Sequence, residues 1–105
     1  MKNSSCDMRG YLSFIVLRLL HKKEMSGEEI RKELEKRKGC KPSPGTIYPV
    51  LKDLNKKGLI VEVDDNGKTK KYKLTDKGKK EMDIATKKFI ALFYDLKEDF
   101  ERYFK

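Results

Sequence analysis

Residues able to bind phosphate gather around one predicted helix start. Ser43 is followed by Pro44, a pair typical of the first turn of a helix, where backbone N–H groups have no partner within the helix. Such N–H groups bind phosphate, and neighbouring hydroxyls donate further hydrogen bonds. The residues at this start or on the predicted polar face of the helix are Lys41, Ser43, Gly45, Thr46, Tyr48, Lys52 and Lys56. Their chemistry indicates recognition of a polyanion.

A second group of cations surrounds a predicted tight turn. Asn66-Gly67 is typical of a two-residue hairpin turn, and it lies between two β-prone runs. The lysines after the turn are Lys68, Lys70, Lys71 and Lys73. Lysines on a hairpin also protect an exposed strand edge from pairing, so alone they favour a merely solvated surface. Beside the helix start described above, phosphate contact becomes the favoured interpretation.

Catalytic and metal-binding patterns do not emerge from the sequence. His21 is the only histidine, and Cys6 and Cys40 lie far apart with no C-x-x-C spacing. We find no Gly-rich phosphate loop and no nucleophile elbow. The longest apolar run, Phe14–Leu17, is far shorter than the roughly 20 residues of a membrane span. We therefore expect a cytoplasmic protein that is not an enzyme and needs no metal or cofactor.

The charge of the chain is positive and unevenly distributed. The 105 residues carry a net charge of +9 and support one small core. Residues 1–91 contain 23 Lys and Arg against 13 Asp and Glu, whereas residues 92–105 contain 3 against 4. The basic part favours nucleic acid or an anionic membrane as partner. The 21 lysines and the absence of glutamine fit a thermophilic archaeon, and an AT-rich genome would enrich lysine as well.

The periodicity of apolar residues predicts helices and one hairpin. Ser26 and Glu29 form a capping box at the start of the second helix, and Pro49 predicts a tight or irregular first turn in the third. The predicted helices span 9–22, 26–38 and 44–57, the strands 59–63 and 69–74, and a long helix follows Thr75. This order is that of a winged helix-turn-helix, so the fold class is α+β and mostly helical.

The long C-terminal helix carries an apolar seam close to a heptad. A chain of this size cannot cover such a seam with its own residues. The first helix has apolar residues on more than one face, so we expect it to join the seam. We therefore expect the chain to pair with a second copy of itself. The predicted interface residues are Tyr11, Phe14, Phe89, Leu92, Phe93, Leu96, Phe100, Tyr103 and Phe104. We divide the chain into a DNA-binding winged helix at residues 1–75, with 1–8 expected to be disordered, and a dimerisation helix at 76–105.

The run Pro42-Ser43-Pro44-Gly45-Thr46-Ile47-Tyr48-Pro49-Val50-Leu51 resembles a signature of the PadR family of transcriptional regulators. Later matches are Gly58-Leu59-Ile60, Lys71–Thr75 and Gly78. The resemblance implies a dimeric winged-helix DNA-binding protein, usually a repressor, that releases its operator on meeting a small effector. The C-terminal part resembles the shorter branch, which has a single helix after the wing. Where the family commonly has G-Y-E-I, this chain has Gly27-Glu28-Glu29-Ile30, without the tyrosine.

Three functions follow from this pattern. The favoured one is a homodimeric repressor on an inverted-repeat operator, with recognition helices about 34–36 Å apart. The alternatives are a nonspecific architectural DNA-binding protein and a winged helix that binds proteins. Tyr48 keeps two interpretations of nearly equal weight, a DNA contact or a structural anchor. The sequence leaves the operator, the target genes and the effector undetermined.

Overall fold

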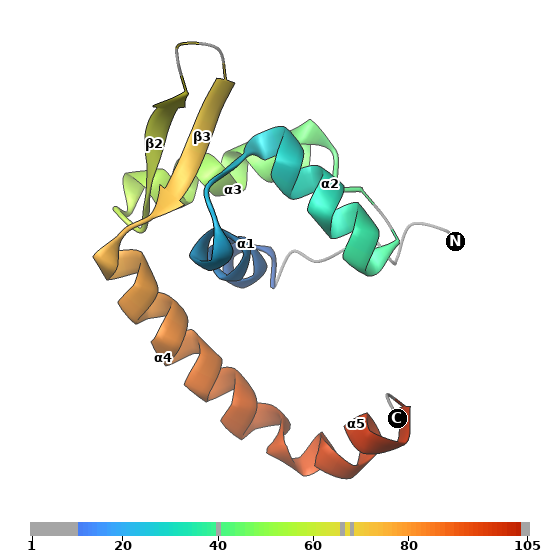
Figure 1. Cartoon of the computed structure of the whole chain (residues 1–105). Helices are drawn as coiled ribbons and strands as arrows, with labels where there is room; N and C mark the ends of the chain where they lie inside the picture. The colour runs from blue at the N-terminus through green and yellow to red at the C-terminus, as the bar shows by residue number, and fades with distance from the viewer. Residues whose placement is uncertain (1–10, 40, 66, 68, 104–105) are drawn as a thin grey trace.

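The computed structural model consists of a helical body, a β-hairpin and a projecting C-terminal arm (Figure 1). It describes residues 11–39, 41–65, 67 and 69–103. The elements are α1 (Leu12–Lys22), β1 (Met25–Ser26), α2 (Gly27–Lys38), α3 (Pro44–Lys56), β2 (Ile60–Asp65), β3 (Thr69–Leu74), α4 (Asp76–Phe93), the 3-10 turn η2 (Tyr94–Leu96) and α5 (Lys97–Tyr103). The predicted α+β class with a long C-terminal helix is confirmed. The expected disorder of 1–8 and the roles predicted for Lys68 and Phe104 lie outside the described residues.

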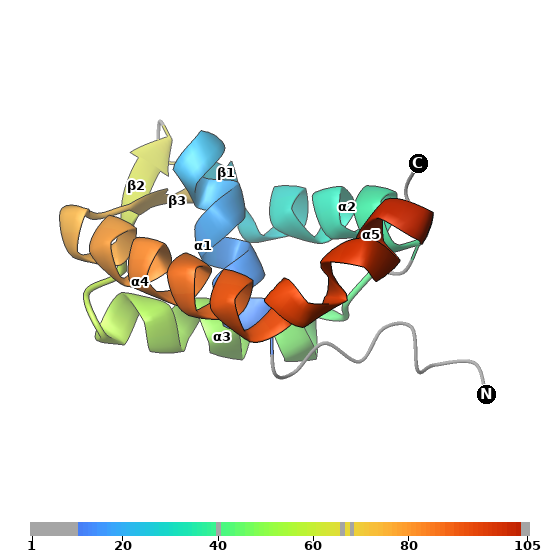
Figure 2. The same cartoon turned by 90° about the horizontal axis from the view of Figure 1, so that it is seen from below.

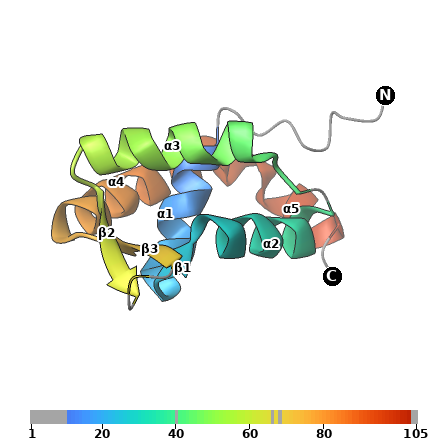
Figure 3. The ribbon, with the colours of Figure 1, turned by 90° about the horizontal axis from the view of Figure 1, so that it is seen from above.

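Helix α1 crosses the body between α2 and α3 (Figures 2 and 3). The sequence placed apolar residues on more than one face of this helix, and the structure buries them because α1 packs against α3, α4 and strand β3. The helix begins at Leu12, later than the predicted residue 9, and Tyr11 occupies its N-cap position. The buried core comprises Leu12, Val16, Leu17, Leu19, Leu20, Met25, Ile30, Leu34, Ile47, Leu51, Leu54, Leu59, Ile60, Tyr72 and Met82.

Helix α2 is capped at both ends, whereas α3 begins without a side-chain cap. Ser26 and Glu29 form the predicted capping box, with Ser26 Oγ accepting from the Glu29 N–H at 3.1 Å. Gly39 ends α2 with φ 75°, a conformation that glycine adopts without steric cost. Ser43 holds the N-cap position of α3, but its side chain caps no backbone N–H. Its carbonyl instead accepts from both Thr46 and Ile47 at 3.0 Å, a shared bond that is common at helix ends.

The hairpin forms the wing. Strands β2 and β3 pair antiparallel from Ile60 opposite Leu74 to Asp65 opposite Thr69. The short strand β1 lines the other edge of β3, giving the sheet order β1-β3-β2. The sequence did not predict β1, because two residues are too few to show the alternation of a strand.

The start of α4 is locked onto the end of α3. Thr75 Oγ1 donates to the carbonyl of Gly58 at 2.7 Å, and it accepts from the Gly78 N–H at 2.9 Å as a helix cap. A side chain at Gly78 would collide with the carbonyl oxygen of Leu59, so only glycine fits there. The long helix then leaves the body in the direction opposite to the wing (Figure 1). The turn η2 interrupts its helical path, which the uninterrupted heptad spacing did not predict.

Candidate nucleic-acid interface

The first turn of α3 is an open polar surface. Ser43, Gly45 and Thr46 are all exposed, and Ser43 Oγ lies 3.2 Å from Thr46 Oγ1. A Cβ placed on Gly45 would have only Ser43 Oγ within 4 Å, at 3.7 Å. Nothing in the fold therefore requires a glycine at this position. The absence of a side chain leaves the backbone at the helix start accessible to a phosphate.

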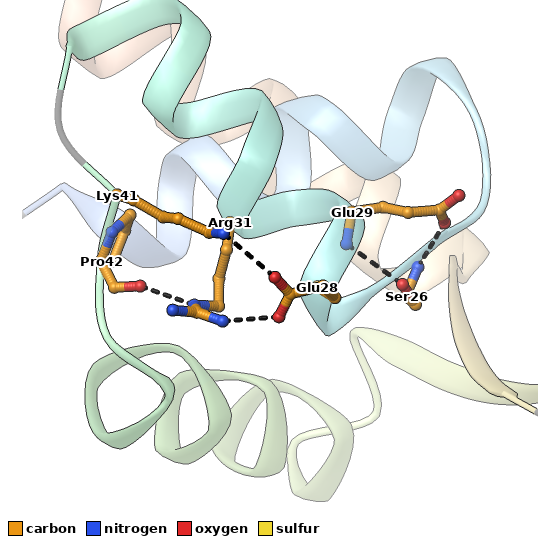
Figure 4. A network of polar contacts seen from close by, with 6 residues as sticks. All are labelled: Ser26, Glu28, Glu29, Arg31, Lys41 and Pro42. Carbon is orange, nitrogen blue, oxygen red and sulfur yellow. Dashed lines mark hydrogen bonds and ion pairs between the residues drawn. The ribbon is translucent and has the colours of Figure 1, made fainter.

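An ion-pair network fixes the segment that leads into this turn (Figure 4). The Arg31 guanidinium donates through Nε to the carbonyl of Pro42 at 2.7 Å and pairs with Glu28. Lys41 Nζ lies 3.2 Å from the other Glu28 oxygen. The Arg31 side chain is only 15% exposed, so these hydrogen bonds are partly shielded from water. The network joins α2 to the residue that precedes the N-cap of α3.

Lys41 is consequently held by the protein. Hydrogen bonds from Lys41 and Arg31 lower the pKa of the Glu28 carboxyl below its ordinary value. To bind phosphate as predicted, Lys41 must therefore break its ion pair with Glu28 and form one with the phosphate.

Tyr48 lies against the first residue of α2. A Cβ on Gly27 would overlap the Tyr48 ring, so the small residue makes room for the aromatic side chain. Tyr48 is 43% exposed, and its neighbour Tyr72 is buried in the core. Burial, then the charge of Glu62 and the proximity of Tyr48, raise the pKa of the Tyr72 hydroxyl. This packing favours the structural interpretation of Tyr48, with its ring joining α3 to α2.

The wing lysines lie on two faces of the hairpin. Alternation along β3 places Lys70 on the face of Tyr72, where its Nζ lies 3.8 Å from Glu62 across the strands. Lys71 and Lys73 lie on the opposite face. Lys71 is half-buried, and its charge, after the hydrogen bond from the Ser26 backbone, contributes to the lowered pKa of Glu29. Lys70, Lys71 and Lys73, the predicted wing lysines that the structure describes, therefore do not form one continuous surface.

The two lysines of α3 that were predicted to contact DNA lie on the exposed side of the helix. Lys52 and Lys56 are exposed one turn apart, whereas Ile47, Leu51 and Leu54 of the same helix are buried. The structure thus brings Ser43, Gly45 and Thr46 together at the helix start and places Lys52 and Lys56 along the helix from them.

Comparison with known proteins identifies the family. Residues 16–84, well over half of the chain, match the model of the transcriptional regulator PadR-like family. The chain belongs to the PadR-like family of transcriptional regulators. The crystal structure of a PadR family transcription regulator from Clostridium difficile superposes with a TM-score of 0.72 at 27% identity, covering 91% of this chain and 100% of that one.

Two further relatives are longer than this PadR-like regulator. Bacillus subtilis PadR in complex with operator DNA superposes with a TM-score of 0.62 at 33% identity, over 71% of this chain and 46% of that one. The transcriptional regulator YqjI of Escherichia coli is 34% identical over 71 residues, or 66% of this chain and 34% of the relative. The chain thus spans about a third of YqjI.

An aromatic cluster joins α1 to α4 in this PadR-like regulator. The ring of Phe89 stacks on Phe14 with centroids 5.5 Å apart, meets Tyr11 edge-on at 6.1 Å and contacts Phe93 at 4.6 Å. Four residues predicted for the dimer interface therefore contact one another within one chain. The exposed apolar residues of the C-terminal arm are Ile84, Phe89, Ile90, Leu92, Tyr94, Leu96, Phe100 and Tyr103.

Several residues of the regulator that position its helices were missed from the sequence. Gly27 and Arg31 join α2 to α3, and Gly78 joins α4 to the turn after α3. The sequence signal for Gly27 was its place at the first position of a helix. Most other residues form helices better than glycine, so a glycine there indicates a close contact. No sequence signal pairs Arg31 with the carbonyl of Pro42, because the contact depends on how the helices cross.

Other kinds of site find no support in the part of the regulator that the structure describes. No group of three or more His, Cys, Asp or Glu side chains within residues 11–39, 41–65, 67 and 69–103 could hold a metal ion. None of the helices in these ranges is long and apolar enough to span a bilayer.

Proposed function

We propose that this PadR-like regulator is a homodimeric repressor that binds an inverted-repeat DNA operator through the first turn of α3 and the wing. The observation that carries the proposal is the exposed start of α3, where Gly45 has no neighbour that excludes a side chain. The operator complex of Bacillus subtilis PadR, which shares the fold, supports DNA as the ligand. We further propose that the chain acts in the cytoplasm and catalyses no reaction.

The dimensions of α3 suit this role. An α-helix about 10–12 Å across enters a major groove about 12 Å wide. Entry by the N-terminal end brings the backbone at Gly45 to a phosphate and the Thr46 hydroxyl to a base edge or a second phosphate. Lys52 and Lys56 then follow the DNA backbone, and the exposed Lys70 and Lys73 of the wing contact phosphates on either side of the hairpin.

The proposed dimer uses the projecting arm. Leu92, Tyr94 and Tyr103 are 72%, 64% and 75% exposed, and Leu96 and Phe100 are exposed as well, so the arm has more apolar surface than a free helix would leave uncovered. A two-fold pairing of the arms puts residues 76–105 in the interface and leaves residues 1–75 to DNA, with half-sites about 34–36 Å apart. A small effector would bind beside the aromatic cluster of Phe14 and Phe89, where a ligand between subunits would alter their spacing.

A mobility-shift assay tests the proposal. A duplex carrying the upstream region of the protein's own gene should be shifted, and random duplex at equal mass should not compete. Competition by random DNA would instead support nonspecific architectural binding, with a steep salt dependence throughout. No shift with any duplex would support a winged helix that binds proteins. Addition of candidate small molecules to the shifted complex tests for effector release.

A further inference from the structure

The end of α3 is bonded to the start of the arm. Three consecutive carbonyls after α3 accept hydrogen bonds from Thr75 or Lys77, although the whole wing separates the two segments in sequence. Lys77 Nζ donates to the carbonyl of Lys57 at 3.0 Å. The Thr75 hydroxyl lies 2.7 Å from the carbonyl oxygen of Gly58 and 3.0 Å from that of Leu59, to which the Thr75 backbone N–H also donates at 3.1 Å. Together these bonds form the α3–α4 junction.

The turn on the α3 side of the junction is itself fixed. Gly58 has φ 79°, and its N–H donates to the carbonyl of Asn55 at 3.0 Å. The N–H of Leu59 donates to the carbonyl of Leu54 at 3.0 Å, and the two bonds together form a Schellman motif at the end of α3. On the α4 side, a side chain at Gly78 would collide with the Leu59 carbonyl oxygen. A shift of α4 against α3 therefore breaks several contacts at once.

The junction connects the two surfaces to which the proposed function gives partners. Helix α3 carries the proposed DNA contact, and α4 begins the arm that carries the proposed dimer contact. Within the chain, α4 is held again further along, where Phe89 stacks on Phe14 of α1. The direction in which α4 leaves the body is therefore fixed relative to α3. In a two-fold dimer, this direction sets the distance and the angle between the two α3 helices.

We propose that Thr75 and Lys77 are positioning residues, which fix the angle between α3 and α4 and so limit the dimer to one spacing of operator half-sites. This inference rests on the proposed homodimeric repressor and adds the residues that set its spacing. One base pair inserted between two half-sites moves the second by about 3.4 Å and turns it by about 35° around the DNA axis. A dimer with a rigid junction cannot follow both movements, so it binds the altered operator weakly.

Binding to operators of altered spacing tests the proposal. The probes are the upstream duplex trimmed to its inverted repeat and two forms with one base pair inserted or removed between the half-sites. The unaltered chain should bind both altered duplexes about tenfold or more weakly than the original. Thr75→Val removes the hydroxyl and Lys77→Met removes the amine, and each should narrow this difference to about threefold. Thr75→Ser keeps the hydroxyl and should keep the full difference.

Two residues of α4 offer matched controls. Thr86→Val makes the same change as Thr75→Val, but Thr86 Oγ1 donates to the carbonyl of Met82 within α4 itself. Lys80→Met makes the same change as Lys77→Met at an exposed position one turn along the helix. Both controls should discriminate between the three duplexes as the unaltered chain does. Sedimentation should give the same dimer dissociation constant for all variants, because none of them changes the apolar residues of the arm.

The outcomes separate the positioning role from the proposed function. Equal weakening on all three duplexes means that the altered residue contacts DNA or only stabilises the chain, and it overturns the positioning role, as does unchanged discrimination. Lys77 is exposed, so Lys77→Met decides the question if Thr75→Val does not fold. An unaltered chain that binds the three duplexes equally, yet in preference to random DNA, overturns the inference and leaves the repressor. No shift by the unaltered chain overturns the proposed function and the inference with it.

Discussion

Gly45 is the residue whose role depends most on a partner outside the chain. Gly27 and Gly78 each have a neighbour that excludes a side chain, and Gly39 has a positive φ. Gly45 has neither constraint, although alanine would favour the helix by up to about 1 kcal/mol. The proposed DNA contact accounts for a glycine that the fold does not need, because a phosphate would approach the backbone closely there.

Gly45→Ala should therefore separate binding from folding. We expect a free energy of unfolding equal to or above that of the unaltered chain, and operator affinity lower by about tenfold or more, because the methyl group displaces the phosphate. Titration by mobility shift and urea denaturation measure the two quantities. Asn55→Ala, exposed at the other end of α3, should change neither by much. Undiminished operator affinity in Gly45→Ala would remove the helix start from the interface.

A second prediction for a single residue concerns Arg31, whose guanidinium holds two groups in a fixed geometry. A lysine at this position would keep the positive charge. It lacks the planar guanidinium, whose N–H groups donate to the Pro42 carbonyl and the Glu28 carboxylate at the same time. Arg31→Lys should lower the free energy of unfolding by about 1–2 kcal/mol and weaken operator binding, since the approach to α3 loosens. Arg37→Lys is a matched control, because Arg37 pairs with Glu33 at the surface, where the change should cost less than about 0.5 kcal/mol. Equal losses in the two variants would contradict a special role for Arg31.

At the scale of elements, the start of α2 makes stability depend on pH. The Ser26 backbone N–H donates to Glu29 at 2.8 Å, and this bond is the largest cause of the lowered Glu29 pKa. A pKa below the ordinary 4.5 in the folded chain means that the stabilisation is complete above 4.5 and is lost as the pH falls through the folded value. Glu28 and Glu33 have shifts of the same sign.

The melting temperature should accordingly fall as the pH drops below about 4.5. Glu29→Gln should melt lower at neutral pH and show a flatter decline, because glutamine keeps part of the capping box without the charge. Thermal denaturation followed by circular dichroism between pH 3 and 7 measures both effects. Glu35→Gln, on an exposed position of the same helix, serves as the control. A decline as steep in Glu29→Gln as in the unaltered chain would place the effect elsewhere.

The elements were predictable from sequence where the signal is local. The capping box at Ser26 and the Pro44 start of α3 each depend on a few adjacent residues, and the structure has both. Gly67 has the positive φ expected of a hairpin turn, but Asp65 pairs with Thr69, so three residues join the strands where a two-residue turn was predicted. The strand β1 and the turn η2 were missed because a two-residue pairing and a local change of helical twist are decided by tertiary contacts. The site follows the same division: the exposed start of α3 was predicted, whereas the pairing of Lys41 with Glu28 was not.

At the scale of the molecule, the proposed function gives the basic body and the near-neutral arm different partners. The wing projects from one side of the body and α4 leaves from the other, so the proposed DNA contact and the proposed dimer contact lie on different sides (Figure 1). The predicted interface residues divide accordingly. Phe14, Phe89 and Phe93 are already packed within the chain, whereas Leu92 and Tyr103 are largely exposed. A mutation that tests the dimer should therefore change an exposed residue such as Leu92 or Tyr103.

Leu92→Asp should dissociate the dimer without unfolding the chain. Leu92 is 72% exposed, so a carboxylate there remains solvated in the monomer and is buried without a partner only when two arms pair. We expect light scattering to report a monomer of about half the mass, an unchanged far-ultraviolet spectrum and loss of cooperative operator binding. Lys88→Asp, an exposed change on the same helix, controls for the added negative charge and should stay dimeric. A Leu92→Asp chain that still scatters as a dimer would move the interface away from this face of α4, and the two-fold spacing of the recognition helices would need another origin.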